Sequence, residues 1–216
     1  MNTFFVSDTH FNHASILKYT TRPWKTLEEM NEGLIANWNA VVRSGDLVYH
    51  LGDVVMGPRK LAGEFLSRLN GRIFLVQGNH DTALPRERFV DRVDFKEIRM
   101  GGGNRGQLIT LCHFSLRVWN KNHYGAWALF GHSHGGLEPW GKSVDVGVDS
   151  PWVTGKAEYR PFHYDEVKAF MDKQEIKVVD HHGVKPEPEK HCITCGKAVS
   201  DSLQPCIGEY TFCIGM

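Results

Sequence analysis

Short apolar runs recur along the chain, and a cluster of polar residues follows each of them. Runs of this length are typical of strands that are buried on both faces. A later stretch alternates apolar and polar residues, as a half-buried strand does. We therefore predict strands at residues 4–6, 47–51, 73–76, 108–112, 127–130 and 143–148.

Patterns with helical spacing lie between these strands. Thr26 and Glu29 form a capping-box sequence, after which apolar residues recur at helical spacing to residue 41. A shorter helix is predicted over residues 59–69, and a closing helix over residues 164–171. Strands that alternate with helices indicate an α/β fold.

The polar clusters contain an unusual number of side chains that can bind metal ions. They contribute seven candidates: Asp8, His10, Asp53, Asn79, His113, His132 and His134. The first two and the last two are spaced i, i+2, which on extended backbone directs both side chains to the same side. One such cluster alone is more simply explained as a cap or a turn, but five in succession at strand ends are hard to assign to chance. Because ligands bind at the carboxyl ends of strands in open α/β sheets, we expect two neighbouring sites, with Asp53 able to bridge two cations.

Length and charge narrow the class of protein. A chain of 216 residues can form one substantial core and a small appendage. Lys plus Arg and Asp plus Glu number 25 each, so the formal net charge is zero, which argues against a nucleic-acid or membrane binder with a basic face. No apolar run approaches the roughly 18 residues of a membrane span, and the N-terminus lacks a secretory signal pattern. We expect a cytoplasmic protein.

The cysteines are concentrated near the C-terminus. Residues 180–190 have the proline and charge content of a linker, which separates a main domain over residues 1–179 from a Cys-rich tail over residues 191–216. The tail begins with a Cys-x-x-Cys-Gly sequence typical of zinc knuckles, but its second pair is more widely spaced. A structural zinc site and a reduced, metal-free tail therefore both remain open; its candidate ligands are Cys192, Cys195, Cys206 and Cys213. Cys112 is predicted to be a small buried hydrophobe.

Five motifs give the chain a family resemblance. The sequences "DTH" (8–10), "GD" (52–53), "GNHD" (78–81), a lone His113 and "GHSH" (131–134) resemble, in order, the signature blocks of the calcineurin-like metallophosphoesterases. The resemblance is nearest to the small single-domain bacterial and phage members, and it covers most of the main domain. It implies a four-layer α-β-β-α sandwich, here followed by the Cys-rich tail.

The resemblance also implies which residues bind which ion. One metal would be bound by Asp8, His10, Asp53 and His134, and the other by Asp53, Asn79, His113 and His132. An imidazole-rich site with two carboxylates suits Mn²⁺, our first expectation, or Fe, Zn, Co or Ni, better than Mg²⁺ or Ca²⁺. The implied reaction is hydrolysis of a phosphomonoester or phosphodiester by attack of a metal-bridging hydroxide.

His80 stands next to a predicted ligand but is not one itself. Adjacent residues on extended backbone point apart, so we expect His80 to face the substrate as a general acid or as a partner of the phosphoryl oxygens. Asp81 is then predicted to fix the tautomer of His80.

Three further residues are candidates for the rim of the site. His13 and Arg22 follow the first motif, and Arg117 follows the lone histidine. Either arginine could clamp a phosphate. The alternative is that these side chains are solvated or packed for structural reasons.

Three functions are compatible with the sequence. The leading one is a dinuclear metal-dependent phosphohydrolase acting on a small phosphate ester or a nucleotide-like substrate. The second is a nuclease or nucleic-acid end-processing phosphatase that docks through its tail, which the zero net charge disfavours. The third is a non-catalytic metal-dependent scaffold, against which the complete ligand set and His80 argue. We expect no membrane partner, and the oligomeric state stays open.

Overall fold

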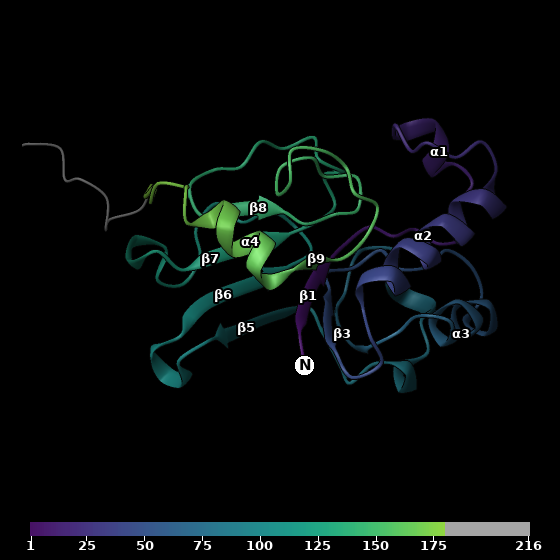
Figure 1. The fold of residues 1–216 in the computed structure, drawn as a ribbon, viewed down its shortest axis with the longest axis horizontal. Helices are drawn as coiled ribbons and strands as arrows, with labels where there is room; N and C mark the ends of the chain where they lie inside the picture. The colour runs from purple at the N-terminus through teal and green to yellow at the C-terminus, as the bar shows by residue number, and fades with distance from the viewer. Residues whose placement is uncertain (180–216) are drawn as a thin grey trace, which may run out of the picture. The chain divides into compact units, whose positions relative to one another are not determined.

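Two stacked β-sheets form the centre of the computed structural model, which describes residues 1–179 (Figure 1). The first sheet has the order β4-β3-β2-β1-β9 and the second the order β5-β6-β7-β8. Pairing is parallel except at β9 and at β5. The strands are β1 (Thr3–Val6), β2 (Leu47–His50), β3 (Arg72–Val76), β4 (Asp91–Val93), β5 (Phe95–Met100), β6 (Gln107–Cys112), β7 (Trp127–Phe130), β8 (Ser143–Asp145) and β9 (Phe162–His163).

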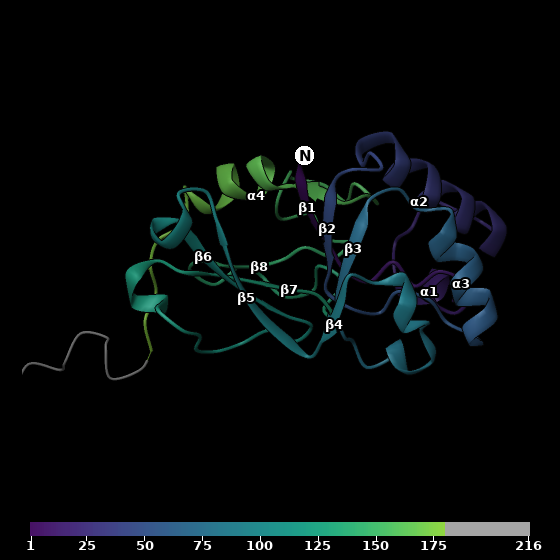
Figure 2. The same ribbon diagram turned by 90° about the horizontal axis from the view of Figure 1, so that it is seen from below.

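The helices among the described residues are α1 (Ile16–Tyr19), α2 (Leu27–Val41), α3 (Arg59–Ser67) and α4 (Tyr164–Met171). The predicted capping box starts α2: the Thr26 hydroxyl accepts the Glu29 N–H, and the Glu29 carboxylate accepts the Thr26 N–H. The three predicted helices are present, although α3 ends two residues before the predicted end. Figure 2 shows α2 and α3 together on the outer side of β1, β2 and β3.

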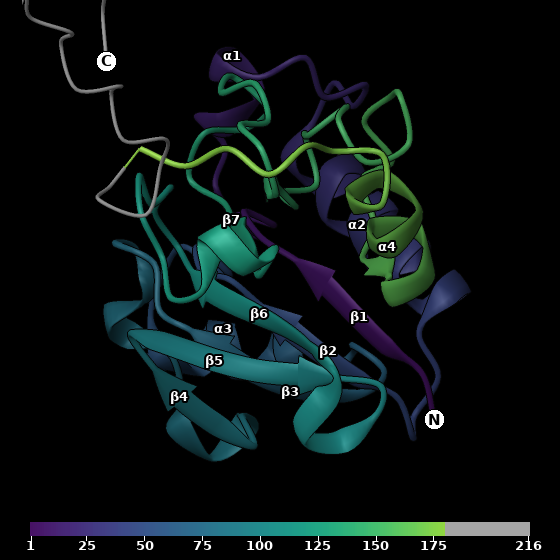
Figure 3. The ribbon, with the colours of Figure 1, turned by 90° about the vertical axis from the view of Figure 1, so that its left-hand side faces the viewer.

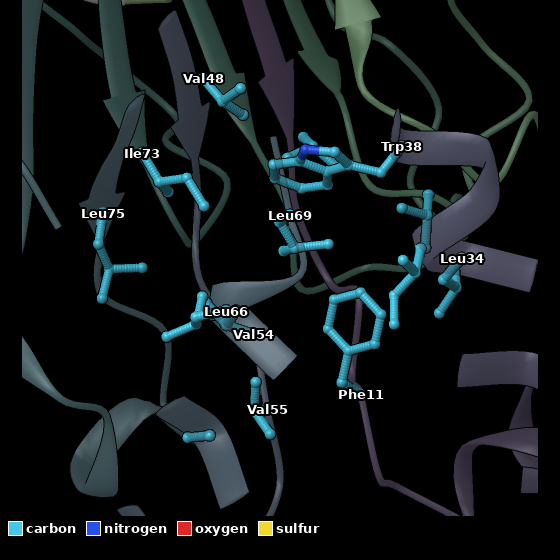
Figure 4. Packing of buried hydrophobic residues seen from close by; sticks show 14 of the residues in the cluster. Phe11, Leu34, Trp38, Val48, Val54, Val55, Leu66, Leu69, Ile73 and Leu75 are labelled. Carbon is cyan, nitrogen blue, oxygen red and sulfur yellow. The ribbon is translucent and has the colours of Figure 1, made fainter. Parts of the chain in front are cut away.

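The first hydrophobic core lies between these helices and the first sheet. Leu34 and Trp38 of α2 and Leu66 of α3 pack with Val48 and Ile73, which stand on the same face of β2 and β3 (Figure 4). Truncating a fully buried tryptophan or leucine in such a core costs about 2–5 kcal/mol. This core holds the helices against the sheet and fixes the strand ends from which the polar loops emerge.

The second core lies between the two sheets, which Figure 3 shows one in front of the other. Phe5 and Tyr49 of the first sheet stack at 5.7 Å between ring centroids, and Leu111 and Leu129 come from the second sheet. Helix α4 adds Val167 to this same core. It therefore closes the space between the sheets rather than forming an outer layer.

The four-layer sandwich implied by the family resemblance would have helices on the outer face of the second sheet, but a different segment covers this face. Leu108 and Ala128 on this face pack with Trp119 from the segment between β6 and β7. The regular structure described in that segment is a single 3₁₀ turn, Asn122–Tyr124. The fold is thus α/β with two sheets, but the four-layer sandwich is not confirmed for the described residues.

The predictions for Cys112 and for the domain organisation can be compared with the structure over the described residues. Cys112 is half-buried at the end of β6, so the prediction that it is a buried hydrophobe is wrong. Residues 1–179 form one compact unit, whereas the linker (180–190) and the Cys-rich tail with its zinc ligands (191–216) lie outside the described residues. Of the helices within residues 1–179, none has both the length and the apolar character that crossing a membrane requires.

Candidate metal centre

Loops at the carboxyl ends of five strands, β1, β2, β3, β6 and β7, bring the predicted ligands together. Two groups form, in each of which the donor atoms all lie within 4.8 Å of one another. The first group is Asp8, His10 and His134; the second is Asp53, His113 and His132. Asn79 joins the second group, because its Oδ1 lies 3.1 Å from Nε2 of His113. This grouping is the one that the resemblance implies.

Asp53 lies between the two groups. Its Oδ2 is 3.5 Å from Nε2 of His10 and 3.5 Å from Nε2 of His113. Burial alone would raise the pKa of Asp53, but hydrogen bonds from His113 and the His80 N–H, together with nearby imidazoles, outweigh it and lower the pKa. The side chain is therefore a carboxylate with one oxygen directed at both groups.

Burial sets the charge of the first group. It raises the pKa of Asp8 to about 7 and lowers the pKa of His10 to about 2. The imidazole of His10 is consequently neutral, which is the form that binds a metal ion. Without a cation, the Asp8 carboxylate is held in surroundings that oppose its charge.

Five of the seven candidate ligands stand on strained backbone. Asp8, His10, Asp53, His132 and His134 all have positive φ, between 48° and 65°. The sequence argument from extended i, i+2 pairs is therefore wrong, and the two histidines of "GHSH" go to different groups. Left-handed conformations at non-glycine residues cost of order 1–3 kcal/mol each and concentrate at functional sites.

Glycines allow the backbone to approach the carboxylates. A Cβ at Gly78 would collide with Oδ1 of Asp53, and a Cβ at Gly131 would collide with Oδ2 of Asp8. The glycines of "GNHD" and "GHSH" are thus required for the close approach of neighbouring loops.

Hydrogen bonds orient the imidazoles through their second nitrogen. Nδ1–H of His113 donates to the carbonyl of Leu51 at 2.6 Å, and Nδ1 of His10 shares a hydrogen bond with Nδ1 of His13 at 3.1 Å. Nδ1–H of His134 donates to Oδ2 of Asp149 at 2.7 Å. Such partners fix the ring orientation of metal-binding histidines and leave Nε2 for the ion.

Asp149 is the main residue that the sequence reasoning missed. Its carboxylate accepts two hydrogen bonds from Arg22, from Nε and Nη2, each of 2.8 Å. Arg22 also donates to the carbonyls of Asp8 and Thr9. These bonds and that from His134 outweigh the effect of burial and lower the pKa of Asp149. The chain Arg22–Asp149–His134 thus ties the first motif to the last.

The prediction that Arg22 binds substrate at the rim is consequently wrong. Its side chain is fully buried, and each of its three nitrogens donates to a protein acceptor. Arg117 stacks over the ring of Trp140, with its guanidinium carbon 4.8 Å from the centroid, and no described contact joins it to either group. His13 does lie at the site, beside His10 and 6.1 Å from the ring of His80.

Asp81 has a role different from the predicted one. Its carboxylate accepts the N–H groups of Asp53, Val54 and Gly78, at 2.8–2.9 Å. No described hydrogen bond joins it to His80, so the prediction that Asp81 fixes the His80 tautomer is wrong. Asp81 instead fastens the loop after β3 to the loop after β2.

His80 faces the first group from the surface. Its exposed ring lies 5.7 Å from the ring of His10, while the neighbouring Asn79 is directed at the second group. The two side chains do point apart, although the reason is a backbone that turns into a 3₁₀ helix rather than an extended one.

The donor atoms fit two divalent cations. Oδ1 of Asp8 and Nε2 of His10 are buried and have no hydrogen-bond partner among the described residues. A buried polar atom without a partner costs about 1–3 kcal/mol. Moreover, Nε2 of His113 and Oδ1 of Asn79 lie only 3.1 Å apart, so a neutral His113 with its proton on Nδ1 would offer a cation two neighbouring donor atoms.

Comparisons with known proteins agree with this geometry. Residues 1–204 match the family model of the calcineurin-like phosphoesterases. The uncharacterized protein MJ1445 of Methanocaldococcus jannaschii is 34% identical over 182 residues, which are 80% of this chain and 93% of that protein. The gene 66 protein of Mycobacterium phage L5 is 34% identical over 90 residues, 40% of this chain and 43% of that protein. The crystal structure of AQ665 from Aquifex aeolicus, a protein of unknown function, superposes with a TM-score of 0.58 at 23% sequence identity. The match covers 78% of this chain and 98% of that one, so the two proteins share the fold.

Proposed function

The chain belongs to the calcineurin-like phosphoesterase family and is therefore a metal-dependent phosphoesterase; from this premise we propose that it is a dinuclear phosphohydrolase that cleaves phosphomonoester or phosphodiester bonds. The observation that carries the proposal is Asp53, whose one oxygen is equidistant from a histidine of each group. A carboxylate in this position could serve both ions, so it favours one dinuclear centre over two independent metal sites.

Seven side chains would hold the ions. Asp8, His10, Asp53 and His134 suit the first, and Asp53, Asn79, His113 and His132 suit the second. When bound, two divalent ions acidify a water molecule and neutralise phosphoryl oxygens. Mn²⁺ is the expected metal, with Fe, Zn, Co or Ni as alternatives, because imidazoles predominate.

His80 is the chain's own candidate for proton transfer. Its exposed ring stands beside His10 and His13. Its N–H donates to Oδ1 of Asp53 at 3.0 Å, so the loop that carries the ring is fixed to the shared carboxylate. A histidine in this place can donate a proton to the departing oxygen, an effect typically worth about 10²–10⁴-fold.

A hydrolysis panel tests the proposal. The full chain, loaded with Mn²⁺, is assayed on mono- and bis-p-nitrophenyl phosphate, cyclic and linear nucleotides, DNA and RNA. We expect hydrolysis of at least one monoester or diester, its loss in Asp53→Asn, and its retention in Asp172→Asn, an exposed aspartate on α4's C-terminal side. Protein that binds two Mn²⁺ per chain yet cleaves nothing on the panel would overturn the proposal in favour of the scaffold reading.

The same panel distinguishes a phosphohydrolase of small esters from a nuclease. Turnover of DNA or RNA well above that of small esters would favour it, whereas the zero net charge favours small phosphate esters. We keep the cytoplasm as the expected compartment.

A further inference from the structure

A cavity of about 470 Å³ opens directly beside the second group. Asn79 and His113, both proposed to hold the second ion, are among the residues that line it. Phe114, Arg92 and Asp94 line it as well. The volume lies within the usual range for small-molecule sites, so a group attached to the phosphate has room next to the reaction centre.

Phe114 gives this cavity an aromatic surface. Its side chain is 48% exposed, which is unusual for a large apolar residue next to a polar centre. The ring makes edge contacts with His113 and His132, at 4.9 Å and 4.7 Å between centroids and at steep interplanar angles. Neither imidazole is stacked parallel on Phe114, and about half of this side chain stays exposed.

The charges of the cavity disfavour a second anionic group. Among the described residues, Arg92 is the only arginine or lysine that lines the cavity, and its three nitrogens donate to Gln77, Leu84 and Asp81. Asp94 adds an exposed carboxylate, of which Oδ1 accepts from Gln77. The other oxygen is left to accept an N–H group of a ligand. A neutral planar ring with an amino group fits these features better than a phosphate or a carboxylate.

We propose that this cavity binds the base of a nucleotide substrate, with Phe114 as the stacking surface and Asp94 as the acceptor for an amino group of the base. The inference rests on the proposed function, since it places the base beside a phosphate at the metal centre. It narrows the substrate class to nucleotides.

A matched pair of substrates tests the site. Adenosine 5′-monophosphate and ribose 5-phosphate carry the same ester to the same primary alcohol and differ in the base. Stacking of a base on an aromatic side chain corresponds to a factor of roughly 5–150. We expect kcat/KM for the nucleotide to exceed that for the sugar phosphate by at least about tenfold, and Phe114→Ala to bring the ratio close to one.

The control is Phe95→Ala. Phe95 is 49% exposed, matches Phe114 in residue type and does not line the cavity, so this variant should keep the ratio. Phe114→Trp should keep it as well, because the larger ring still stacks. Equal kcat/KM values for the two substrates in the wild type, or an unchanged ratio in Phe114→Ala, would overturn the inference.

The binding of adenosine and of ribose, measured by calorimetry, tests the base site separately from the proposed function. It also tests the base site if neither adenosine 5′-monophosphate nor ribose 5-phosphate is hydrolysed. Adenosine should bind to the wild type more tightly than ribose, and about tenfold more weakly to Phe114→Ala. Adenosine binding that depends on Phe114, in protein that cleaves no ester, would sink the proposed function and leave the base site standing. Cleavage of p-nitrophenyl phosphate without any adenosine binding would do the reverse.

Discussion

Replacing Asp149 with asparagine removes the charge at the centre of the Arg22–Asp149–His134 chain. Arg22 is fully buried, and its two hydrogen bonds to Asp149 are both 2.8 Å long. Removing one partner of a buried ion pair costs about 3–5 kcal/mol, since the other charge stays in a poorly solvated place. The amide keeps the volume and one acceptor, so we expect the lower end, about 3 kcal/mol.

The loss should appear in two measurements. In a chain of this size, 1 kcal/mol corresponds to about 2–4 °C, so the Tm of metal-free Asp149→Asn should fall by roughly 6–12 °C. Mn²⁺ affinity, measured against a competing chelator, should fall about 10–100-fold, because His134 loses the carboxylate that orients it. The control is Glu32→Gln, which breaks an exposed ion pair with Arg68 and should scarcely change either quantity.

A double variant separates the two effects. In Arg22→Met with Asp149→Asn, no unpaired charge remains buried, so part of the lost stability should return. The metal affinity should stay low, since His134 still lacks its carboxylate. Wild-type Tm and wild-type Mn²⁺ affinity in Asp149→Asn alone would refute the reasoning.

Three further predictions follow from the site. Asp81→Asn replaces an acceptor of three backbone N–H groups by an amide with a single oxygen, so it should lower both Tm and Mn²⁺ affinity; a variant with both unchanged would contradict the fastening role. His80→Ala should retain both Mn²⁺ ions and lose more activity on an alkyl or nucleoside phosphate than on a p-nitrophenyl ester, which needs little acid catalysis; loss of metal would show that His80 is a ligand. A chain ending at Asp180 should fold and stay active, while the full chain should bind one more Zn²⁺ by elemental analysis; equal zinc contents would exclude the zinc knuckle.

The sequence predicted six of the nine described strands, three of the four described helices and the seven candidate ligands, because these depend on local patterns; it did not predict β4, β5, β9 or α1. Apolar runs, the capping box at Thr26 and the order of five motifs can all be read without knowing which distant segments meet. The grouping of the ligands came from the family resemblance, since His132 and His134, two residues apart, belong to different groups.

The partners of the site could not be read in the same way. Arg22 and Asp149 are 127 residues apart, and nothing in the pattern around either residue pairs them. Asp81 follows His80 directly, yet the 3₁₀ turn directs its carboxylate to backbone N–H groups of another loop. The positive φ of the ligands is likewise invisible in a motif, because left-handed backbone at aspartate and histidine is set by tertiary contacts.

The most direct test of the central claim is the Mn²⁺ content of Asp53→Asn. Mn²⁺ is counted, rather than total metal, so that zinc bound elsewhere in the chain does not enter the result. Because the Asp53 carboxylate faces a histidine of each group, the wild type should hold two Mn²⁺ per chain, and the variant should hold fewer than two and have little activity. Two Mn²⁺ per chain and wild-type turnover in Asp53→Asn would contradict a dinuclear centre built on this residue.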